Sequence, residues 1–400
     1  MLNEYGRVSG VFDKVLVLWL DAYSSRFLSF PEAKFVKGFS EQNTFALIRP
    51  TFAYKGIGYS IFTGASINKH RVWMEHSFAK NHHSVSLKQA IRLSEIIPND
   101  YLQKAARFAL YKGWRAYYGT PHLIPVKYLD YFAQVKPKPI PTLFDTLRTN
   151  KIGYCYCEPK TSFGEASLFR RLRSLVSRHD LVYAKFNSLD RLGHMFGPLS
   201  KEVRNRIKWL DIMLKDSLTQ ISRDNKRTLI LIFSDHGMTP VGNIIDIESK
   251  LEKVDLEVGK DYVAYEGSTY WAFYFLKRNV KEIIEDKLAN VAAGKMITPE
   301  AVEDRWGVEP NVSKKFGDAF YVLKEGTVAF PDFYRRQIPP NGMHGYFDAE
   351  WDAPVIVLSG QKGKQEKNSF VEFHDITPTI YKALGLSIPS WCDGTPLQFQ

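Results

Sequence analysis

Four short apolar segments, spread over the whole chain, constrain the fold more than any other feature. Residues 14–20, 181–186, 228–233 and 354–358 are almost continuously apolar. Such runs are typical of strands that are buried on both faces, as in a parallel sheet covered by helices. Between them, residues 200–221 place apolar side chains three or four positions apart, as an amphipathic helix does. This alternation predicts an α/β fold with a doubly wound, mostly parallel sheet flanked by helices.

Two regions interrupt the alternation. Residues 66–138 are rich in aromatic side chains and show helical patterns, and residues 241–335 carry charged helices and one apolar strand. We expect the first region to be a helical insertion and the second to be an insertion that forms a cap over a site. The remaining segments form the predicted α/β core, which holds the candidate metal ligands described below: 1–65, 139–240 and 336–400.

The charge balance favours an anionic partner. The net charge is +11 at pH 7, and a basic surface attracts phosphates and other anions. The basic residues are dispersed, without a polybasic tail or a nucleic-acid-binding motif. The composition therefore indicates an anionic small molecule rather than DNA or RNA.

The cysteines and the hydropathy pattern bear on the cellular compartment. Cys155, Cys157 and Cys392 are too few for a disulfide framework, and we expect them to be thiols in a reducing environment. No apolar stretch approaches the roughly 18 residues that a membrane-spanning helix requires, and no secretory signal is visible. The sequence therefore predicts a cytoplasmic location without a transmembrane segment.

Acidic residues follow three of the predicted strands. Asp21 directly follows the first apolar run, Asp190 follows the second by a short loop, and Asp235 and His236 follow the third. Because ligands bind beyond the carboxyl ends of parallel strands, these side chains are expected to lie close together. His194 comes four residues after Asp190, which places both on one face of a helix. Carboxylates with neutral imidazoles suit zinc, with manganese or iron as alternatives.

Several motifs resemble one known family. They are Asp-Arg-Leu-Gly-His-Met-Phe-Gly-Pro (190–198), Ser-Asp-His-Gly-Met (234–238) and Gly-Met-His-Gly-Tyr (342–346), with further similar segments at 141–147 and 374–397. Their sequence and order are similar to those of the type I phosphodiesterase/nucleotide pyrophosphatase branch of the alkaline phosphatase superfamily. The resemblance implies an alkaline-phosphatase-like fold that binds two divalent metal ions and a phosphate-ester substrate.

The resemblance also assigns the metal ligands to two groups. It implies that one ion is held by Asp190, His194 and His344. It implies that the other is held by Asp21, Asp235 and His236. In this family a Thr or Ser attacks phosphorus and forms a covalent intermediate, which water then hydrolyses.

The nucleophile is the position at which the family pattern is irregular. Relatives place it at a helix start about ten residues before a Thr-Gly pair, which here is Thr63-Gly64. An ungapped count arrives at Tyr54, whereas Thr51 lies in a segment that resembles the family's Thr-Phe element. We prefer Thr51, because a hydroxyl at a helix N-terminus can be deprotonated with the help of a metal and the helix dipole. A purely structural role for Thr51, as a helix N-cap, is the alternative.

Three further residues are candidates for substrate contact. Lys55 would lie one helical turn after Thr51 and neutralise a phosphate oxygen, unless it is simply solvated. Arg191 would meet the substrate or form an ion pair. Tyr346 would line the pocket.

The sequence leaves several reactions open. The leading hypothesis is hydrolysis of phosphodiester or nucleotide pyrophosphate bonds, or phosphoryl transfer through the same intermediate. The alternatives are a phosphomonoesterase, phosphonate hydrolase or mutase with the same metal site, and a non-catalytic metal-binding homologue with an altered nucleophile. A sulfatase is disfavoured, because no Cys or Ser stands in a Cys/Ser-x-Pro-x-Arg context near residue 51.

Overall fold

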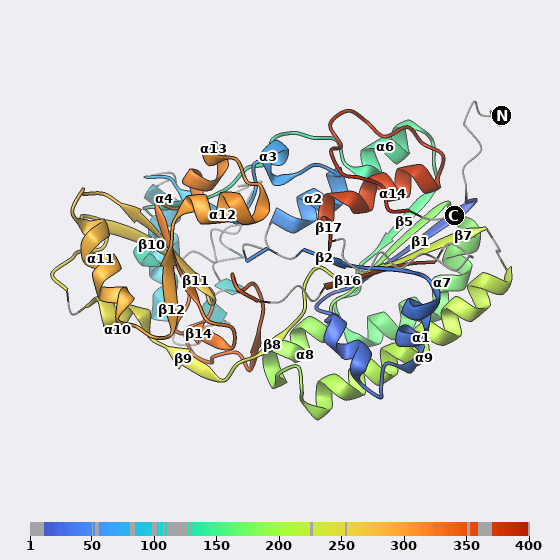
Figure 1. Cartoon of the computed structure of the whole chain (residues 1–400), viewed down its shortest axis with the longest axis horizontal. Coiled ribbons are helices and arrows are strands. Elements are labelled where there is room, and N and C mark those ends of the chain that lie inside the picture. Colours follow the sequence, from blue (N-terminus) through green and yellow to red (C-terminus); the bar gives the residue numbers. More distant parts are fainter. Residues whose placement is uncertain are drawn as a thin grey trace.

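The computed structural model has two lobes, which lie side by side in Figure 1. It describes residues 12–49, 51–52, 56–80, 85–97, 102–103, 105–106, 109, 126–128, 130–224, 227–252, 254–349, 353–358 and 370–398.

A seven-stranded sheet lies at the centre of one lobe, in the order β17-β2-β16-β7-β1-β6-β5. Its strands are β1 (Lys14–Leu20), β2 (Thr44–Ile48), β5 (Tyr154–Cys157), β6 (Leu181–Phe186), β7 (Thr228–Phe233), β16 (Ala353–Leu358) and β17 (Phe370–Val371). The neighbours β5, β6, β1 and β7 are all parallel. The predicted α/β fold with a mostly parallel sheet is confirmed.

Strand β16 is the exception, because it runs antiparallel to both β7 and β2. Its residue Val355 lies opposite Phe233, the last residue of β7, so β16 starts at the carboxyl edge of the sheet. The chain arrives at this edge through His344 and enters β16 at Ala353. A strand that starts there must run back across the sheet. The apolar run at 354–358 is therefore a sheet strand as predicted, but an antiparallel one.

Helices cover both faces of this sheet, because the side chains of β1 alternate between the faces. The odd-numbered side chains, Val15 to Trp19, pack with α2 (Ile57–Thr63), α6 (Leu143–Thr149) and α14 (Ile376–Ala383). The even-numbered side chains, Leu16 to Leu20, pack with α1 (Lys34–Gln42), α7 (Ser162–Arg178) and α9 (Lys201–Asp224). The predicted amphipathic helix is α9. In the described part of the chain, no helix has both the length and the apolar character to cross a lipid bilayer.

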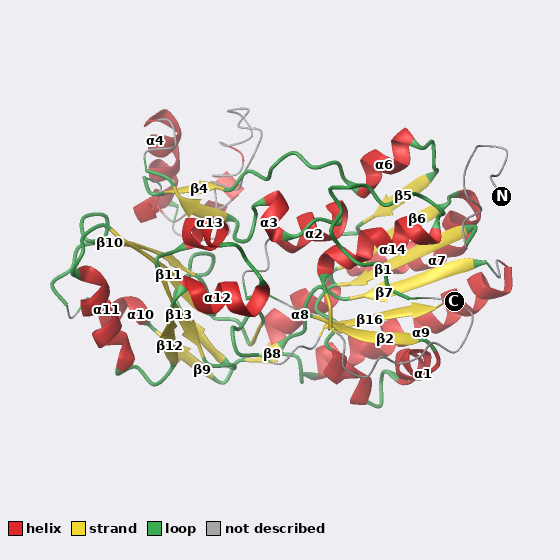
Figure 2. Cartoon of the chain, turned by 45° about the horizontal axis from the view of Figure 1, so that its top comes forward, coloured by secondary structure: helices red, strands yellow, loops and turns green. Residues whose placement is uncertain are grey.

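An antiparallel four-stranded sheet organises the other lobe, which we call the cap lobe (Figure 2). Its order is β10 (Tyr262–Glu266), β11 (Tyr270–Phe275), β13 (Ala319–Leu323) and β12 (Gly294–Ile297). Helices α10 (Ile247–Leu251) and α11 (Val280–Ala289) pack on one face, and α12 (Pro299–Trp306) packs on the other. The sequence predicted only the strand that is β11. The continuously apolar β13 carried a readable signal, whereas β10 and β12 include charged residues and did not.

The described residues of segment 66–138 include strands as well as helices. Beside α3 (Ile67–His70) and α4 (Val85–Leu93) it contributes two paired strands, β3 (His76–Phe78) and β4 (Phe132–Gln134). This segment packs on the cap sheet, since Trp73 and Phe132 share an apolar cluster with Phe320. The buried carboxylate of Glu266 accepts hydrogen bonds from Lys127 Nζ at 2.7 Å and Tyr128 OH at 2.6 Å. The described parts of the two insertions are therefore tied to each other by both apolar and polar contacts.

Candidate metal centre and active site

Three neighbouring parallel strands deliver acidic side chains to one edge of the large sheet. The carboxyl ends of β6, β1 and β7 meet there. Asp21 directly follows β1, and Asp235 and His236 follow β7 after a single serine. Helix α8 (Ser188–Phe196) begins just after β6 and carries Asp190 and His194 in its first and last turns. The order of the sheet therefore accounts for the convergence of these five residues.

His344 reaches the same edge from a distant part of the chain. It directly follows the short strand β15 (Gly342–Met343), which pairs with β8 (Thr239–Pro240) just beyond His236. The Nδ1 atom of His194 lies 2.8 Å from the carbonyl oxygen of Gly342 and ties α8 to this strand. The structure thus brings together all six side chains that the sequence proposed as metal ligands.

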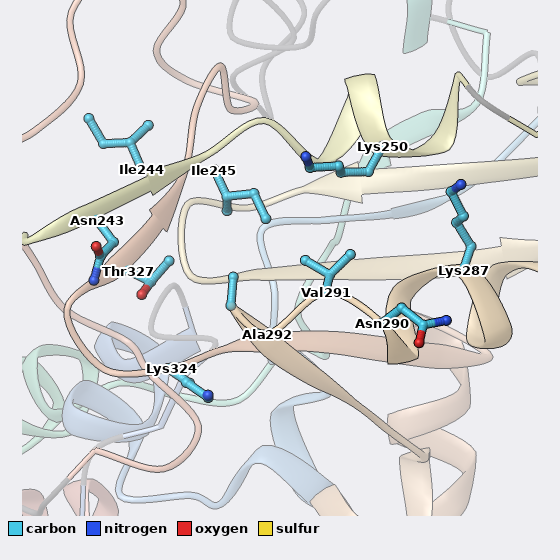
Figure 3. A pocket seen from close by; sticks show the side chains of 11 residues that line it. Asn243, Ile244, Ile245, Lys250, Lys287, Asn290, Val291, Ala292, Lys324 and Thr327 are labelled. Atoms are coloured by element: carbon cyan, nitrogen blue, oxygen red, sulfur yellow. The ribbon is translucent and has the colours of Figure 1, made fainter.

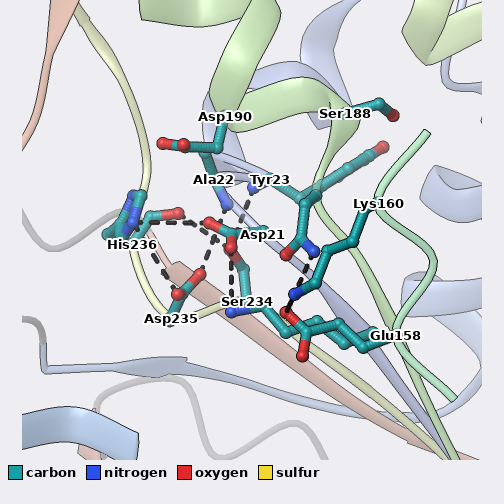
Figure 4. A network of polar contacts seen from close by, with 12 residues as sticks. Asp21, Ala22, Tyr23, Glu158, Lys160, Ser188, Asp190, Ser234, Asp235 and His236 are labelled. Atoms are coloured by element: carbon teal, nitrogen blue, oxygen red, sulfur yellow. Dashed lines mark hydrogen bonds and ion pairs between the residues drawn. The ribbon is translucent and has the colours of Figure 1, made fainter. Parts of the chain in front are cut away.

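The ligand atoms form two overlapping groups. One atom each of Asp21, Asp235 and His236 lie within 4.8 Å of one another, and the same holds for Asp190, His236 and His344. His236 therefore lies between the groups, with its ring stacked on that of His344 at a centroid separation of 3.5 Å. Figure 4 shows Asp21, Asp190, Asp235 and His236 directed toward a common centre.

His194 stands slightly apart from these two groups. Its Nε2 atom lies 3.3 Å from Asp190 Oδ1, but the tighter group around Asp190 contains His236 and His344 instead. The family resemblance paired His236 only with Asp21 and Asp235. In the structure His236 adjoins both groups.

The orientation of the histidine rings suits metal binding. The Nδ1 atoms of His194 and His236 lie 2.8 and 2.9 Å from the carbonyl oxygens of Gly342 and Gly237. A carbonyl oxygen only accepts, so each Nδ1 carries a proton, and Nε2 is the ring atom that faces the carboxylates and is available to a metal ion. Metal-binding histidines are commonly oriented by such backbone contacts.

The Oδ1 atom of Asp190 supplies a second test of this fit. It is buried and makes no hydrogen bond within the described residues. The Nε2 atoms of His194 and His344 lie 3.3 and 3.6 Å from it. A buried carboxylate oxygen without a hydrogen bond is costly unless a cation lies beside it. The donor set of carboxylates and imidazoles therefore fits one or more divalent metal ions of the zinc type.

The electrostatics of the cluster also favour a bound cation. Burial, followed by repulsion from Asp235, raises the pKa of Asp21 to about 7, although Lys185 opposes the shift. Burial and the neighbouring imidazoles of His236 and His194 hold the pKa of His344 well below its ordinary value. The site thus holds one carboxyl group, Asp21, whose ionised form is disfavoured by burial and repulsion, and one imidazole, His344, that resists protonation. A divalent cation would relieve both effects.

The pKa values of Asp190 and His236 are also shifted by their neighbours. Burial would raise the pKa of Asp190, but the imidazoles of His194 and His344 hold it well below its usual range. Burial would lower the pKa of His236, but Asp235 and Asp21 raise it instead.

Backbone contacts that the sequence did not reveal hold the strand ends in place. Ala22 adopts a positive φ of 61°, and its N–H donates to Asp235 Oδ1 at 3.3 Å. The N–H of Tyr23 donates to Ser234 Oγ at 2.9 Å, and Ser234 Oγ donates to the carbonyl oxygen of His236 at 2.7 Å. These bonds fix the turn after β1 against the turn after β7. The serine in Ser-Asp-His-Gly was the one visible signal for them.

Comparison with known proteins settles the family. The family model "Type I phosphodiesterase / nucleotide pyrophosphatase" matches residues 50–347, which is well over half of the chain. The chain belongs to the type I phosphodiesterase/nucleotide pyrophosphatase family. The resemblance that the motifs suggested is therefore confirmed.

Solved structures of this family share the fold. Murine ectonucleotide pyrophosphatase/phosphodiesterase 5 superposes with a TM-score of 0.64 at 15% identity, covering 96% of this chain and 97% of the murine one. An inactive variant of the murine protein in complex with AMP gives a TM-score of 0.63 at 15% identity, with the same coverage. The human protein gives 0.61 at 16% identity, covering 97% of each chain. At this level of identity the likeness establishes the fold alone.

The nucleophile positions of the family fall in a segment that is only partly described. Tyr54 and Lys55 lie outside the described residues. Thr51 is buried, and its Oγ1 accepts a hydrogen bond from Trp73 Nε1 at 3.0 Å. Helix α2 begins at Ile57 with Gly56 as its N-cap. Thr51 is therefore not the N-cap of that helix, and because residues 53–55 lie outside the described part of the chain, its role as nucleophile stays a prediction.

The remaining candidate substrate residues have contacts within the protein. Arg191 donates to the carbonyl oxygen of Lys160 at 3.4 Å and to Ser162 Oγ at 3.2 Å, near the start of α7. Tyr346 is buried in a small apolar cluster with Val328 and Met343. A role in substrate binding for these two residues stays a prediction.

A separate pocket of about 760 Å³ lies in the cap lobe (Figure 3). Three lysines line it together with polar and small apolar side chains: Lys250, Lys287 and Lys324. None of the candidate metal ligands contributes to its lining. It is therefore distinct from the metal centre.

We predict that zinc stabilises the chelator-treated protein and that Asp235→Asn reduces this effect. The ion should relieve the repulsion between Asp21 and Asp235 and raise the free energy of unfolding by about 2 kcal/mol or more at saturating concentration. Thermal unfolding with and without added zinc measures the effect. Asp216→Asn, at an exposed position of α9, is the matched control and should respond like the wild type. An equal response of Asp235→Asn and the wild type would contradict the ligand assignment.

Proposed function

We propose that the chain is a two-metal phosphohydrolase that cleaves phosphodiester or nucleotide pyrophosphate bonds through a covalent phospho-enzyme intermediate. The observation that carries this proposal is the convergence of six buried or half-buried Asp and His side chains at the carboxyl edge of β6, β1 and β7. Membership of the phosphodiesterase family supports the bond type. The net charge of +11 suits an anionic phosphate-ester substrate.

The proposed metal ligands form two groups of three side chains. Asp190, His194 and His344 would hold one ion. Asp21, Asp235 and His236 would hold the other. Two such ions, for which this donor set suits zinc, would supply electrophilic stabilisation of the phosphoryl group and of the leaving oxygen.

Thr51 is the proposed nucleophile. Its Oγ1 would attack phosphorus while the bond between phosphorus and the leaving-group oxygen breaks, and the hydroxyl proton passes to solvent. A water molecule would then cleave the phosphothreonine and restore the hydroxyl. The indole N–H of Trp73 is a donor only, so Thr51 Oγ1 is the acceptor of their 3.0 Å bond. Donation to this oxygen stabilises negative charge on it and fixes its direction.

The state of the cysteines bears on the proposed cellular location. Cys155, Cys157 and Cys392 are all free, which is compatible with a reducing compartment such as the cytoplasm. We therefore retain the cytoplasmic assignment as a proposal. The similar solved proteins are named as ectoenzymes, and that name applies to them.

A panel of nitrophenyl esters with added zinc or manganese tests the reaction class. We expect turnover of a bis-nitrophenyl phosphate diester and of a nucleotide nitrophenyl ester to exceed that of the phosphate monoester and the sulfate ester. His344→Ala should abolish turnover, because it removes a ligand, while leaving the overall fold intact by circular dichroism. A preference for the monoester would favour a phosphomonoesterase, and the absence of any metal-dependent turnover would favour a non-catalytic homologue.

Substitutions at Thr51 and Trp73 test the nucleophile. Thr51→Ala should abolish turnover, and Thr51→Ser should retain part of it because the hydroxyl remains. Trp73→Phe keeps an aromatic ring in the buried cluster but removes the donor, and should lower kcat by about 100-fold with a smaller effect on KM. Mass spectrometry of acid-quenched protein would locate the phosphorylated residue. Near-wild-type activity of Thr51→Ala would transfer the role to Tyr54 or to another group.

A further inference from the structure

A buried lysine lies directly against the candidate metal centre. Lys185, on β6, places its Nζ atom 2.9 Å from Oδ2 of Asp21. Its side chain is only 15% exposed. The proposed reaction assigns Asp21 to metal binding and gives this ammonium group no part.

Lys185 is held in this position by an aromatic ring. Its Nζ atom lies 3.8 Å from the centroid of the Trp19 ring, which is itself buried at the end of β1. The contact is a cation–π interaction, and it keeps the ammonium group at the site rather than in solvent. The positive charge of Lys185 is therefore held at a fixed position beside Asp21.

The contact divides the two oxygens of Asp21 between two partners. Oδ2 meets the ammonium group of Lys185, whereas Oδ1 lies 3.5 Å from Nε2 of His236. Oδ1 is then the oxygen of Asp21 that faces His236. One of the two carboxylates in the group of Asp21, Asp235 and His236 is therefore partly neutralised before any metal binds.

In the described part of the chain, no lysine forms an ion pair with Asp190 of the other group. Within the described residues, the ion pairs of Asp190 are with the imidazoles of His194 and His344. An imidazole can itself bind a metal ion, whereas a lysine ammonium group is a cation that competes with one. The two groups therefore offer different net charge to an incoming cation.

We propose that Lys185 is a positioning residue that acts as an internal counter-ion for the group of Asp21, Asp235 and His236. It holds Asp21 so that one oxygen is directed at the ion, and it competes with that ion for the carboxylate charge. As a consequence, the two ions load in order, first at Asp190, His194 and His344 and then, more weakly, beside Lys185. This inference rests on the proposed two-metal function.

Zinc titration of the chelator-treated full chain, in competition with a chromophoric chelator, tests the proposal. The wild type should bind two ions in two separate steps. Lys185→Gln keeps a hydrogen-bond donor near Asp21 but removes the charge, and should tighten the weaker step by about tenfold or more while leaving the stronger step unchanged. Lys185→Arg keeps the charge and should behave like the wild type.

A control lysine and a second variant complete the experiment. Lys160 is 73% exposed and pairs with Glu158 at 2.8 Å, so Lys160→Gln should leave both steps unchanged. Lys185→Met, which removes the charge at similar volume, should reproduce the effect of Lys185→Gln. If either uncharged variant folds only with zinc present, folding at stoichiometric zinc would support the proposal, because the metal then replaces the lost charge. Failure to fold even with zinc would contradict it.

The possible failures are distinguishable. If the wild type binds two ions but Lys185→Gln leaves the weaker step unchanged or weakens it, Lys185 is a structural residue and only this inference is overturned. If the wild type does not bind two ions, the proposed two-metal function fails, and the inference fails with it.

Discussion

Electrostatic repulsion between the buried carboxylates of Asp21 and Asp235 is the constraint on which the rest of the structure depends. Burial and this repulsion together raise the pKa of Asp21 to about 7. Keeping both carboxylates ionised at this place therefore costs free energy, which the rest of the fold must offset. The two residues follow neighbouring strands, β1 and β7, whose side chains are almost entirely buried. Apolar burial on both faces of the sheet supplies the stabilisation, and a cation at the strand ends would remove the penalty.

The proposed catalytic parts belong to both lobes. The candidate metal ligands are attached to the large sheet and to α8, whereas Phe52, next to Thr51, packs at ring-centroid distances of 5.0 and 4.8 Å from Trp73 and Tyr270 of the cap lobe. Thr51 is bound to the same Trp73. These aromatic contacts therefore tie the proposed nucleophile to the cap lobe. A substitution in the aromatic cluster should act on catalysis without touching a metal ligand.

Much of the site was predictable because it is local in sequence. Apolar runs that end in an acid identify strand ends, and parallel strands bring their ends to one edge, which was sufficient to group Asp21, Asp190 and Asp235. The position of His344 came from the family resemblance, since its approach depends on the pairing of β15 with β8.

The direction of β16 and most of the cap sheet were missed. Strand direction depends on where the chain enters the sheet, and short strands that contain charged residues lack a periodic signal. The contacts of Lys185 with Asp21 and of Trp73 with Thr51 join distant segments through side chains, so they could not be predicted from a local sequence pattern.

A crystal structure of the zinc-loaded protein with orthovanadate, with anomalous data at the zinc edge, tests the central claim most directly. We predict two zinc peaks, one contacting Asp190, His194 and His344 and the other contacting Asp21, Asp235 and His236, with vanadate between them and the Thr51 hydroxyl. The absence of zinc at these six side chains, or a single ion held by other residues, would contradict the account.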